Sequence, residues 1–499
     1  MTDNISRRTV LGGLAGAVGL AACRGGSAEN DWDLIVVGAG TAGLPAAIFS
    51  AQRGARVLLV DAAARVGGTL LIATGQMSAA GTRVQREKGI EDTPQLHYDD
   101  VMRISNNTAD PTLVRLAVEN APVTFDWLMD NGFDMLPDHP VAGRAHEPYS
   151  ERRYYWGAAF GLSILAVLER ALQPGLDKNL IKISLETRVT ELARDPSGAV
   201  IGVVTKDKHG GVGQYRGRNV LLACGGYASN PSLFQELCGH ADYGDTSYEF
   251  AQGDGIGLGT RAGGYLRGRE NYLCNFGAIL VNDDFPARVS ARFISHPQQR
   301  APWEIYVNAN GQRFIQEDIP SVDAREHALL QQPDLRYWIV FDQTILDTAP
   351  VGVRGWTRED LRIAFDRHPM FFQGATVEAL AERCGLPAVA LQDTLRTYNQ
   401  GVAAGDDLLG RKHLPSPIAN GPFYAIRVQG YSTTSSVGVA VDEQLRVIRK
   451  DGVAIPNLYA AGELLGAGQL MGQAFCGGMM ITPAVTFGRL LGQRILDFA

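Results

Sequence analysis

The stretch Asp33-Leu-Ile-Val-Val-Gly-Ala-Gly-Thr-Ala-Gly43 decides the fold. Its apolar run, residues 34–37, is typical of a buried parallel strand. Gly38, Gly40 and Gly43 follow in G-x-G-x-x-G spacing, and a helical pattern begins directly after them. The first glycine allows a tight turn, the second lets a pyrophosphate approach the backbone, and the third lets helix and strand pack closely. The stretch therefore predicts dinucleotide binding at a helix N-terminus.

A second strand-like run, residues 56–60, ends at Asp61, which lies 18 residues after Gly43. A carboxylate at this distance is the expected partner of the adenosine ribose hydroxyls. Strand, glycine turn, helix, second strand and acid therefore occur in the order of a Rossmann-like unit. This combination is much more specific than an isolated glycine motif, and it predicts an α/β fold.

Length and composition limit the classes of protein that the chain can represent. Its 499 residues predict two or more domains, and its hydrophobic share of 45% is that of a globular protein. The net charge of −7 and the lack of basic clusters interleaved with aromatic residues argue against a nucleic-acid partner. The cysteines after residue 30 are scattered, with no C-x-x-C or C-x-x-C-H, so neither a disulfide framework nor a haem or metal site is predicted.

Residues 1–30 read as a targeting segment and stay outside the fold. Ser6-Arg7-Arg8-Thr9-Val10-Leu11, followed by an apolar run, resembles a twin-arginine export signal, which carries proteins that fold around a cofactor before export. An ordinary secretory signal with two arginines is the alternative. Leu20-Ala21-Ala22-Cys23 also resembles a lipoprotein cleavage box, which would place a lipid anchor on Cys23. We therefore expect a periplasmic protein.

The sequence pattern changes in the second half of the chain. Residues 276–431 contain a hairpin signal at Asn310-Gly311 and a helical pattern over 376–403, and they read as an inserted α+β domain. The flanking segments, 31–275 and 432–499, then form one discontinuous nucleotide-binding domain.

Four further segments carry cofactor-type glycines after apolar strands or in loops: Gly67-Gly68-Thr69, 219–230, Gly253-Asp254-Gly255 and 457–463. The last three of these segments, together with the N-terminal fingerprint, resemble the FAD-dependent fumarate reductase/succinate dehydrogenase flavoprotein superfamily, which includes the 3-ketosteroid dehydrogenases. The resemblance implies a Rossmann-like FAD-binding domain, an inserted capping domain, and hydride transfer between the flavin and a carbon–carbon bond next to a carbonyl or carboxylate. It also implies that FAD contacts Gly38, Gly40, Gly43, Asp61, Gly68, Thr69, Val189, Asp254 and Glu463.

The substrate positions depart from that family. Fumarate reductases clamp a dicarboxylate with arginines and histidines, and they use an arginine four residues after the R-F-x-x-E glutamate as proton donor. Here R-F-x-x-E is residues 313–317 and the donor position is Ser321. A clamp histidine becomes Thr434 and the late clamp arginine becomes Phe475, which leaves His296 as the matching piece.

The loss of these cations favours a neutral, hydrophobic carbonyl compound over a small dicarboxylate. Removing hydrogens next to a ketone needs a base, a hydride acceptor and a donor to the carbonyl oxygen. The candidates for base or donor are Tyr431, Tyr306, His296 and Ser321, beside the apolar Phe475. Each of these four residues also has a purely structural interpretation. Tyr306 would belong to a strand of the capping domain, Ser321 would cap a helix N-terminus, Tyr431 would lie at the domain junction, and His296 would make a loop contact.

The sequence therefore predicts an FAD enzyme that dehydrogenates a hydrophobic ketone such as a 3-ketosteroid. One alternative is the reverse chemistry, a periplasmic enone or enoate reductase. Another is a flavin electron carrier without enzyme activity, which the large inserted cap argues against. Because the chain has no haem motif, we expect electrons to pass to or from a separate quinone or redox protein.

Overall fold

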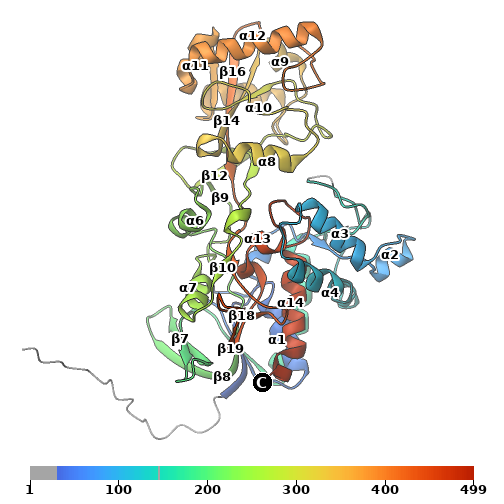
Figure 1. The fold of residues 1–499 in the computed structure, drawn as a ribbon, viewed down its shortest axis with the longest axis vertical. Coiled ribbons are helices and arrows are strands. Elements are labelled where there is room, and N and C mark those ends of the chain that lie inside the picture. Colours follow the sequence, from blue (N-terminus) through green and yellow to red (C-terminus); the bar gives the residue numbers. More distant parts are fainter. Residues whose placement is uncertain (1–30, 144–145, 499) are drawn as a thin grey trace, which may run out of the picture.

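The computed structural model describes residues 31–143 and 146–498, and it has two lobes stacked along the long axis of the molecule (Figure 1). The predicted export signal and Cys23 lie outside the described residues. Within the described part of the chain, no helix combines the length and apolarity needed to cross a bilayer. Its cysteines Cys224, Cys238, Cys274, Cys384 and Cys476 are free thiols.

The lower lobe is built on an eight-stranded sheet in which β1 lies between and parallel to β2 and β8. Residues 34–36 in β1 are fully buried, as the continuous apolar run predicts for a strand covered on both faces. The strands are β1 (Asp31–Val37), β2 (Val57–Val60), β5 (Ile181–Ser184), β6 (Thr187–Arg194), β7 (Val200–Asp207), β8 (Val212–Leu222), β18 (Arg446–Ile448) and β19 (Ala454–Ala460).

Helices from both ends of the chain cover this sheet. The helix after the glycine turn, α1 (Gly43–Gln52), packs against the C-terminal α14 (Ile481–Arg494), so the first and last parts of the lower lobe lie side by side (Figure 1). The other helices are α2 (Arg83–Glu87), α3 (Pro94–Ile104), α4 (Pro111–Asp130), α5 (Gly161–Asp177), α6 (Pro231–Cys238), α7 (Asp254–Arg261) and α13 (Ala467–Leu470). Two short ribbons pair β3 (Met77–Ser78) with β4 (Tyr154–Tyr155), and β10 (Leu266–Arg267) with β17 (Gly438–Val439).

The upper lobe holds a second, mostly antiparallel sheet of seven strands. Its strands are β9 (Gly244–Asp245), β11 (Asn275–Leu280), β12 (Ala287–Arg292), β13 (Ile305–Val307), β14 (Arg336–Asp342), β15 (Phe371–Gly374) and β16 (Phe423–Tyr431). Its helices are α8 (Val322–Leu330), α9 (Gln343–Thr348), α10 (Arg358–Arg367), α11 (Val377–Cys384) and α12 (Ala388–Ala404). Where the chain enters and leaves this lobe, Asn275 pairs with Tyr431.

Two local expectations differ in detail from the structure. The helical segment 376–403 is two helices, because Gly385 adopts the left-handed conformation that ends α11 and Pro387 precedes α12. The hairpin at Asn310-Gly311 is reduced to one bridge between Val307 and Arg313. Arg313 instead makes a buried ion pair with Glu317 and Asp407, which holds the following loop in place.

Candidate functional site

The glycine turn has the close packing that its spacing predicts. Gly38 has φ +108°, and a Cβ there would lie 2.3 Å from the carbonyl oxygen of Ala223. A Cβ on Gly43 would lie 1.8 Å from the carbonyl oxygen of Gly38. The turn therefore brings the start of α1 against the end of β1, and the N–H groups of the first helical turn are left for a phosphate.

Asp61 lies directly beside this turn. Its Oδ2 accepts a hydrogen bond of 2.6 Å from the backbone N–H of Ala39, and its Oδ1 accepts one of 2.7 Å from Ala63. Burial raises the pKa of this carboxyl, while the two backbone hydrogen bonds oppose that rise. The bonds fix the carboxylate at the end of β2, where a ribose would meet it.

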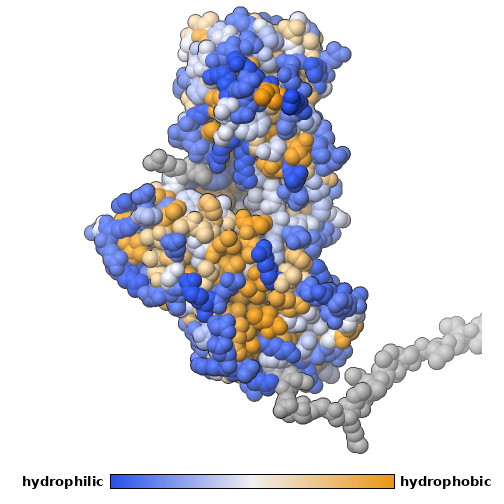
Figure 2. All heavy atoms as spheres, turned by 180° about the vertical axis from the view of Figure 1, so that it is seen from behind, coloured by the Kyte–Doolittle hydropathy of each residue, from blue (hydrophilic) through white to orange (hydrophobic). Residues whose placement is uncertain are grey.

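One elongated cavity of about 570 Å³ starts at the glycine turn and reaches the upper lobe. Figure 2 shows the surface hollowed between the two lobes. Of the predicted cofactor residues, Gly43 serves packing instead of lining the cavity. The others all line it: Gly38, Gly40, Asp61, Gly68, Thr69, Val189, Asp254 and Glu463. Residues more than 400 positions apart in sequence thus line one part of the cavity, the flavin cradle, and its glycines and carboxylates fit a dinucleotide flavin.

The far end of the cradle combines a carboxylate with a helix N-terminus. Glu463 Oε1 accepts a hydrogen bond of 3.0 Å from the backbone N–H of Ser435, and burial raises the pKa of Glu463. Ile481, the first residue of α14, also lines the cavity. The positive end of this helix dipole is therefore available to stabilise negative charge on a reduced flavin ring.

The predicted catalytic residues fall into two groups. Tyr431, His296 and Phe475 line the cavity beyond the flavin cradle. Tyr306 and Ser321 are not among the lining residues. Tyr306 is fully buried in β13 of the cap, and Ser321 caps α8 by accepting a hydrogen bond from the N–H of Ala324. The catalytic role of each residue stays a prediction.

The two titratable residues in the first group are electrically neutral near pH 7. Burial, aided by Arg325 and His146, lowers the pKa of His296 to about 4, and its Nδ1 is buried without a hydrogen-bond partner among the described residues. Burial raises the pKa of Tyr431. The imidazole can therefore donate or accept a hydrogen bond without carrying charge, and the phenol keeps its proton.

Two arginines that the sequence analysis missed also line this end of the cavity: Arg292 and Arg354. A bridge between Phe293 and Val353 joins their segments, and the N–H of Arg354 donates to the carbonyl oxygen of Arg292 at 2.9 Å. The Arg292 guanidinium carbon lies 5.1 Å from the ring centre of Tyr431. Neither arginine forms an ion pair with a carboxylate in the described ranges. The cavity is therefore lined by two cationic side chains, although neither stands at a position where the family resemblance implies a clamp residue.

Comparisons with known proteins agree with this geometry. The sequence profile of a family described as "FAD binding domain" matches residues 33–479. A fumarate reductase (cytochrome) of Shewanella frigidimarina is 29% identical over 95% of this chain and 78% of its own length. A 3-oxosteroid 1-dehydrogenase of Mycobacterium tuberculosis is 24% identical over 94% of this chain and 99% of its own length. The open conformation of a flavocytochrome c3 fumarate reductase superposes with a TM-score of 0.71 at 28% identity, over 94% of this chain and 78% of that one.

Proposed function

Because this chain belongs to the FAD binding domain family and is an FAD-dependent oxidoreductase, we propose that it reduces the carbon–carbon double bond of an unsaturated monocarboxylate with an apolar tail. This is the reductase that the sequence analysis held as an alternative. The single observation that carries it is the pair Arg292 and Arg354 at the substrate end of the cavity.

The two guanidinium groups suit one carboxylate. Arginine binds a carboxylate through two parallel hydrogen bonds, and these bonds are about twice as strong as those between neutral groups. Both side chains are exposed to solvent, so they lie at the mouth of the cavity. An acid bound there would place its tail against Phe475, Phe276 and Met480, which line the same cavity.

FAD, when bound, supplies the ring that gives or takes a hydride. The chain's own residues would orient the substrate and supply a proton. Tyr431 keeps its hydroxyl proton because burial raises its pKa, and the adjacent Arg292 stabilises the phenolate left after proton transfer. Neutral His296 would hold a substrate oxygen through its N–H.

Dehydrogenation of a hydrophobic ketone is the second candidate, and a specific observation favours it. Phe475 and Met480 give one wall of the cavity an apolar surface without a cation, and Tyr431 could hydrogen-bond to a ketone oxygen. Under either function we propose that electrons pass through a separate quinone or redox protein. We further propose that the protein is exported by the twin-arginine route and anchored through Cys23.

Flavin absorbance under anaerobic conditions tests both candidates. Photoreduced holoenzyme should be reoxidised by a 3-arylacrylate or an alkyl enoate, and more slowly by the neutral methyl ester of the same acid. Oxidised holoenzyme should remain oxidised when a saturated 3-ketosteroid is added. Reduction of the flavin by that steroid would favour the second candidate. If neither class of compound reacts, both candidates are wrong.

Charge-removing variants test the role of the two arginines. Arg292→Gln and Arg354→Gln should each raise KM for the acid about 10- to 150-fold, as expected when a charged hydrogen bond of about 1.5–3 kcal/mol is lost, and should leave KM for the ester unchanged. Arg362→Gln is the matched control, because Arg362 is an exposed cap arginine on α10 that pairs with Asp347. Equal effects on acid and ester would contradict a carboxylate-binding role.

A further inference from the structure

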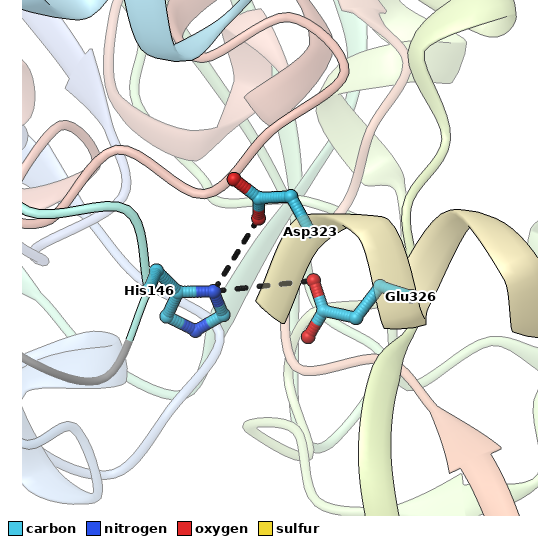
Figure 3. Close-up of side chains that lie close together, drawn as sticks. All are labelled: His146, Asp323 and Glu326. Carbon is cyan, nitrogen blue, oxygen red and sulfur yellow. Dashed lines mark ion pairs between the residues drawn. The ribbon is translucent and has the colours of Figure 1, made fainter. Parts of the chain in front are cut away.

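We infer that His146, Asp323 and Glu326 form a binding site for one divalent metal cation at the wall of the substrate cavity. Asp323 and Glu326 are three residues apart on α8, so they project from the same face of the helix. His146 comes from a loop of the lower lobe and points at both carboxylates (Figure 3). Its Nδ1 lies 3.5 Å from Asp323 Oδ1 and 3.9 Å from Glu326 Oε2.

The contacts among these three side chains leave buried polar atoms without hydrogen bonds. His146 Nδ1 and Asp323 Oδ2 are buried atoms without a hydrogen-bond partner among the described residues. The Asp323 side chain is 8% exposed and that of Glu326 is 3% exposed. Buried polar atoms almost always have partners, so this pattern indicates a group that binds between them.

The charge of the cluster also calls for a cation. The carboxyl groups of Asp323 and Glu326 are both buried and lie next to each other. The neighbouring Arg325 does not neutralise them by direct contact: its Nη1 donates to the carbonyl oxygen of Ile319, and within the described ranges it forms no ion pair. Two neighbouring carboxylates are costly in a protein interior when both are ionised, and a bound dication removes that cost.

The distances fit metal coordination. One donor atom from each of the three residues lies within 4.8 Å of the other two. The donors are close enough for one cation to bridge them after small side-chain shifts, and Zn²⁺ typically lies about 2.0–2.2 Å from nitrogen and carboxylate ligands. One imidazole with two carboxylates suits Zn²⁺, Mn²⁺ or Fe²⁺ better than Mg²⁺ or Ca²⁺.

The site opens onto the substrate. His146 and Glu326 both line the cavity, and the ring of Phe475 packs against His146 at a tilt, with 4.2 Å between ring centres. Three protein ligands leave coordination positions open, as in catalytic metal centres. An open position would bind an oxygen of the substrate's carboxylate or carbonyl group and would place positive charge beside an otherwise apolar wall. This role of the open position rests on the proposed function, whereas the cation site does not.

Metal binding to the resting holoenzyme, without substrate, tests the site. Holoenzyme stripped with a chelator should bind one Mn²⁺ or Zn²⁺ in isothermal titration calorimetry, with a Kd in the micromolar range. His146→Gln, Asp323→Asn and Glu326→Gln should each weaken binding at least 30-fold, while His209→Gln, at an exposed loop histidine, should bind as the wild type does. Each variant's fold is checked by its flavin spectrum and Tm.

Pulsed electron paramagnetic resonance of bound Mn²⁺ identifies the histidine. The wild type should show coupling to one imidazole nitrogen, and His146→Gln should lose it. The inference is overturned if the stripped holoenzyme binds neither cation below 1 mM, or if folded variants of all three residues bind as the wild type does. If the protein binds the metal but does not reduce enoates, the proposed function is refuted and the metal site is not. If it reduces enoates but binds no metal, the metal site is refuted and the proposed function is not.

Discussion

Two glycines of the same motif should fail in different ways when each is replaced by alanine. At Gly43, an added Cβ would lie 1.8 Å from the carbonyl oxygen of Gly38, while real Cβ atoms essentially never come closer than 3.0 Å. The turn and α1 would have to separate by about 1.2 Å, although α1 is almost wholly buried. Overpacking against backbone should cost about 3 kcal/mol or more, so Gly43→Ala should lose the fold of the lower lobe.

At Gly40 the nearest atom to an added Cβ is the Cα of Gly68 at 3.6 Å, which is an ordinary contact. Gly40→Ala should therefore fold normally but keep the pyrophosphate away from the backbone. Losing one charged hydrogen bond of about 1.5–3 kcal/mol would weaken FAD binding about 10- to 150-fold.

The assay compares Tm of the apoprotein with FAD affinity, measured by quenching of flavin fluorescence. Gly257→Ala is the control, because Gly257 does not line the cavity and an added Cβ there would first meet the flexible end of the Arg261 side chain, at 2.8 Å. If Gly40→Ala binds FAD within twofold of the wild type, or if Gly43→Ala keeps its Tm, these different roles for the two glycines are refuted.

Three further changes should act on stability. Burial raises the pKa of Asp242 to about 7, so the folded protein holds a proton there that the unfolded chain releases above about pH 4. Stability should fall as pH rises from 4 to 7, and Asp242→Asn should raise the free energy of unfolding by about 2 kcal/mol at pH 8 but little at pH 4, as measured by urea titration. Arg153→Met should lower the free energy of unfolding by about 3–5 kcal/mol, because buried Asp92 loses its ion-pair partner and buried Asp100 keeps only Arg103; a loss below 1 kcal/mol would contradict this. Ser321→Ala should lower the free energy of unfolding by about 1 kcal/mol, because it removes the cap of α8, and should leave kcat unchanged. A large fall in kcat would instead indicate that Ser321 is catalytic.

The cofactor half of the site could be predicted because its signals are local. A strand, a glycine turn and an acid after the next strand determine one supersecondary unit, and the structure places Gly38, Gly40 and Asp61 in one cavity as that unit requires. The superfamily resemblance was also confirmed by the family match over residues 33–479.

The substrate half could not be predicted in the same way. Position after the R-F-x-x-E stretch selected Ser321, yet α8 begins there, and the residues that reach the cavity are Val322 and Glu326. Arg292 and Arg354 are 62 positions apart in sequence, and the bridge that joins them has no local signature. Spacing in the sequence therefore missed the residues that meet only through tertiary structure.

The pairing of Asn275 with Tyr431 has a consequence for the history and mechanics of the molecule. Apart from β9, the upper lobe begins and ends on neighbouring strands, so residues 275–431 are attached like a cassette whose two ends leave the lower lobe together. Such a cassette can be lengthened, shortened or exchanged without interrupting the sheet that binds the cofactor. The same ribbon is a natural hinge, and since Tyr431 is at once its last residue and part of the cavity wall, any tilt of the cassette would carry that phenol with it.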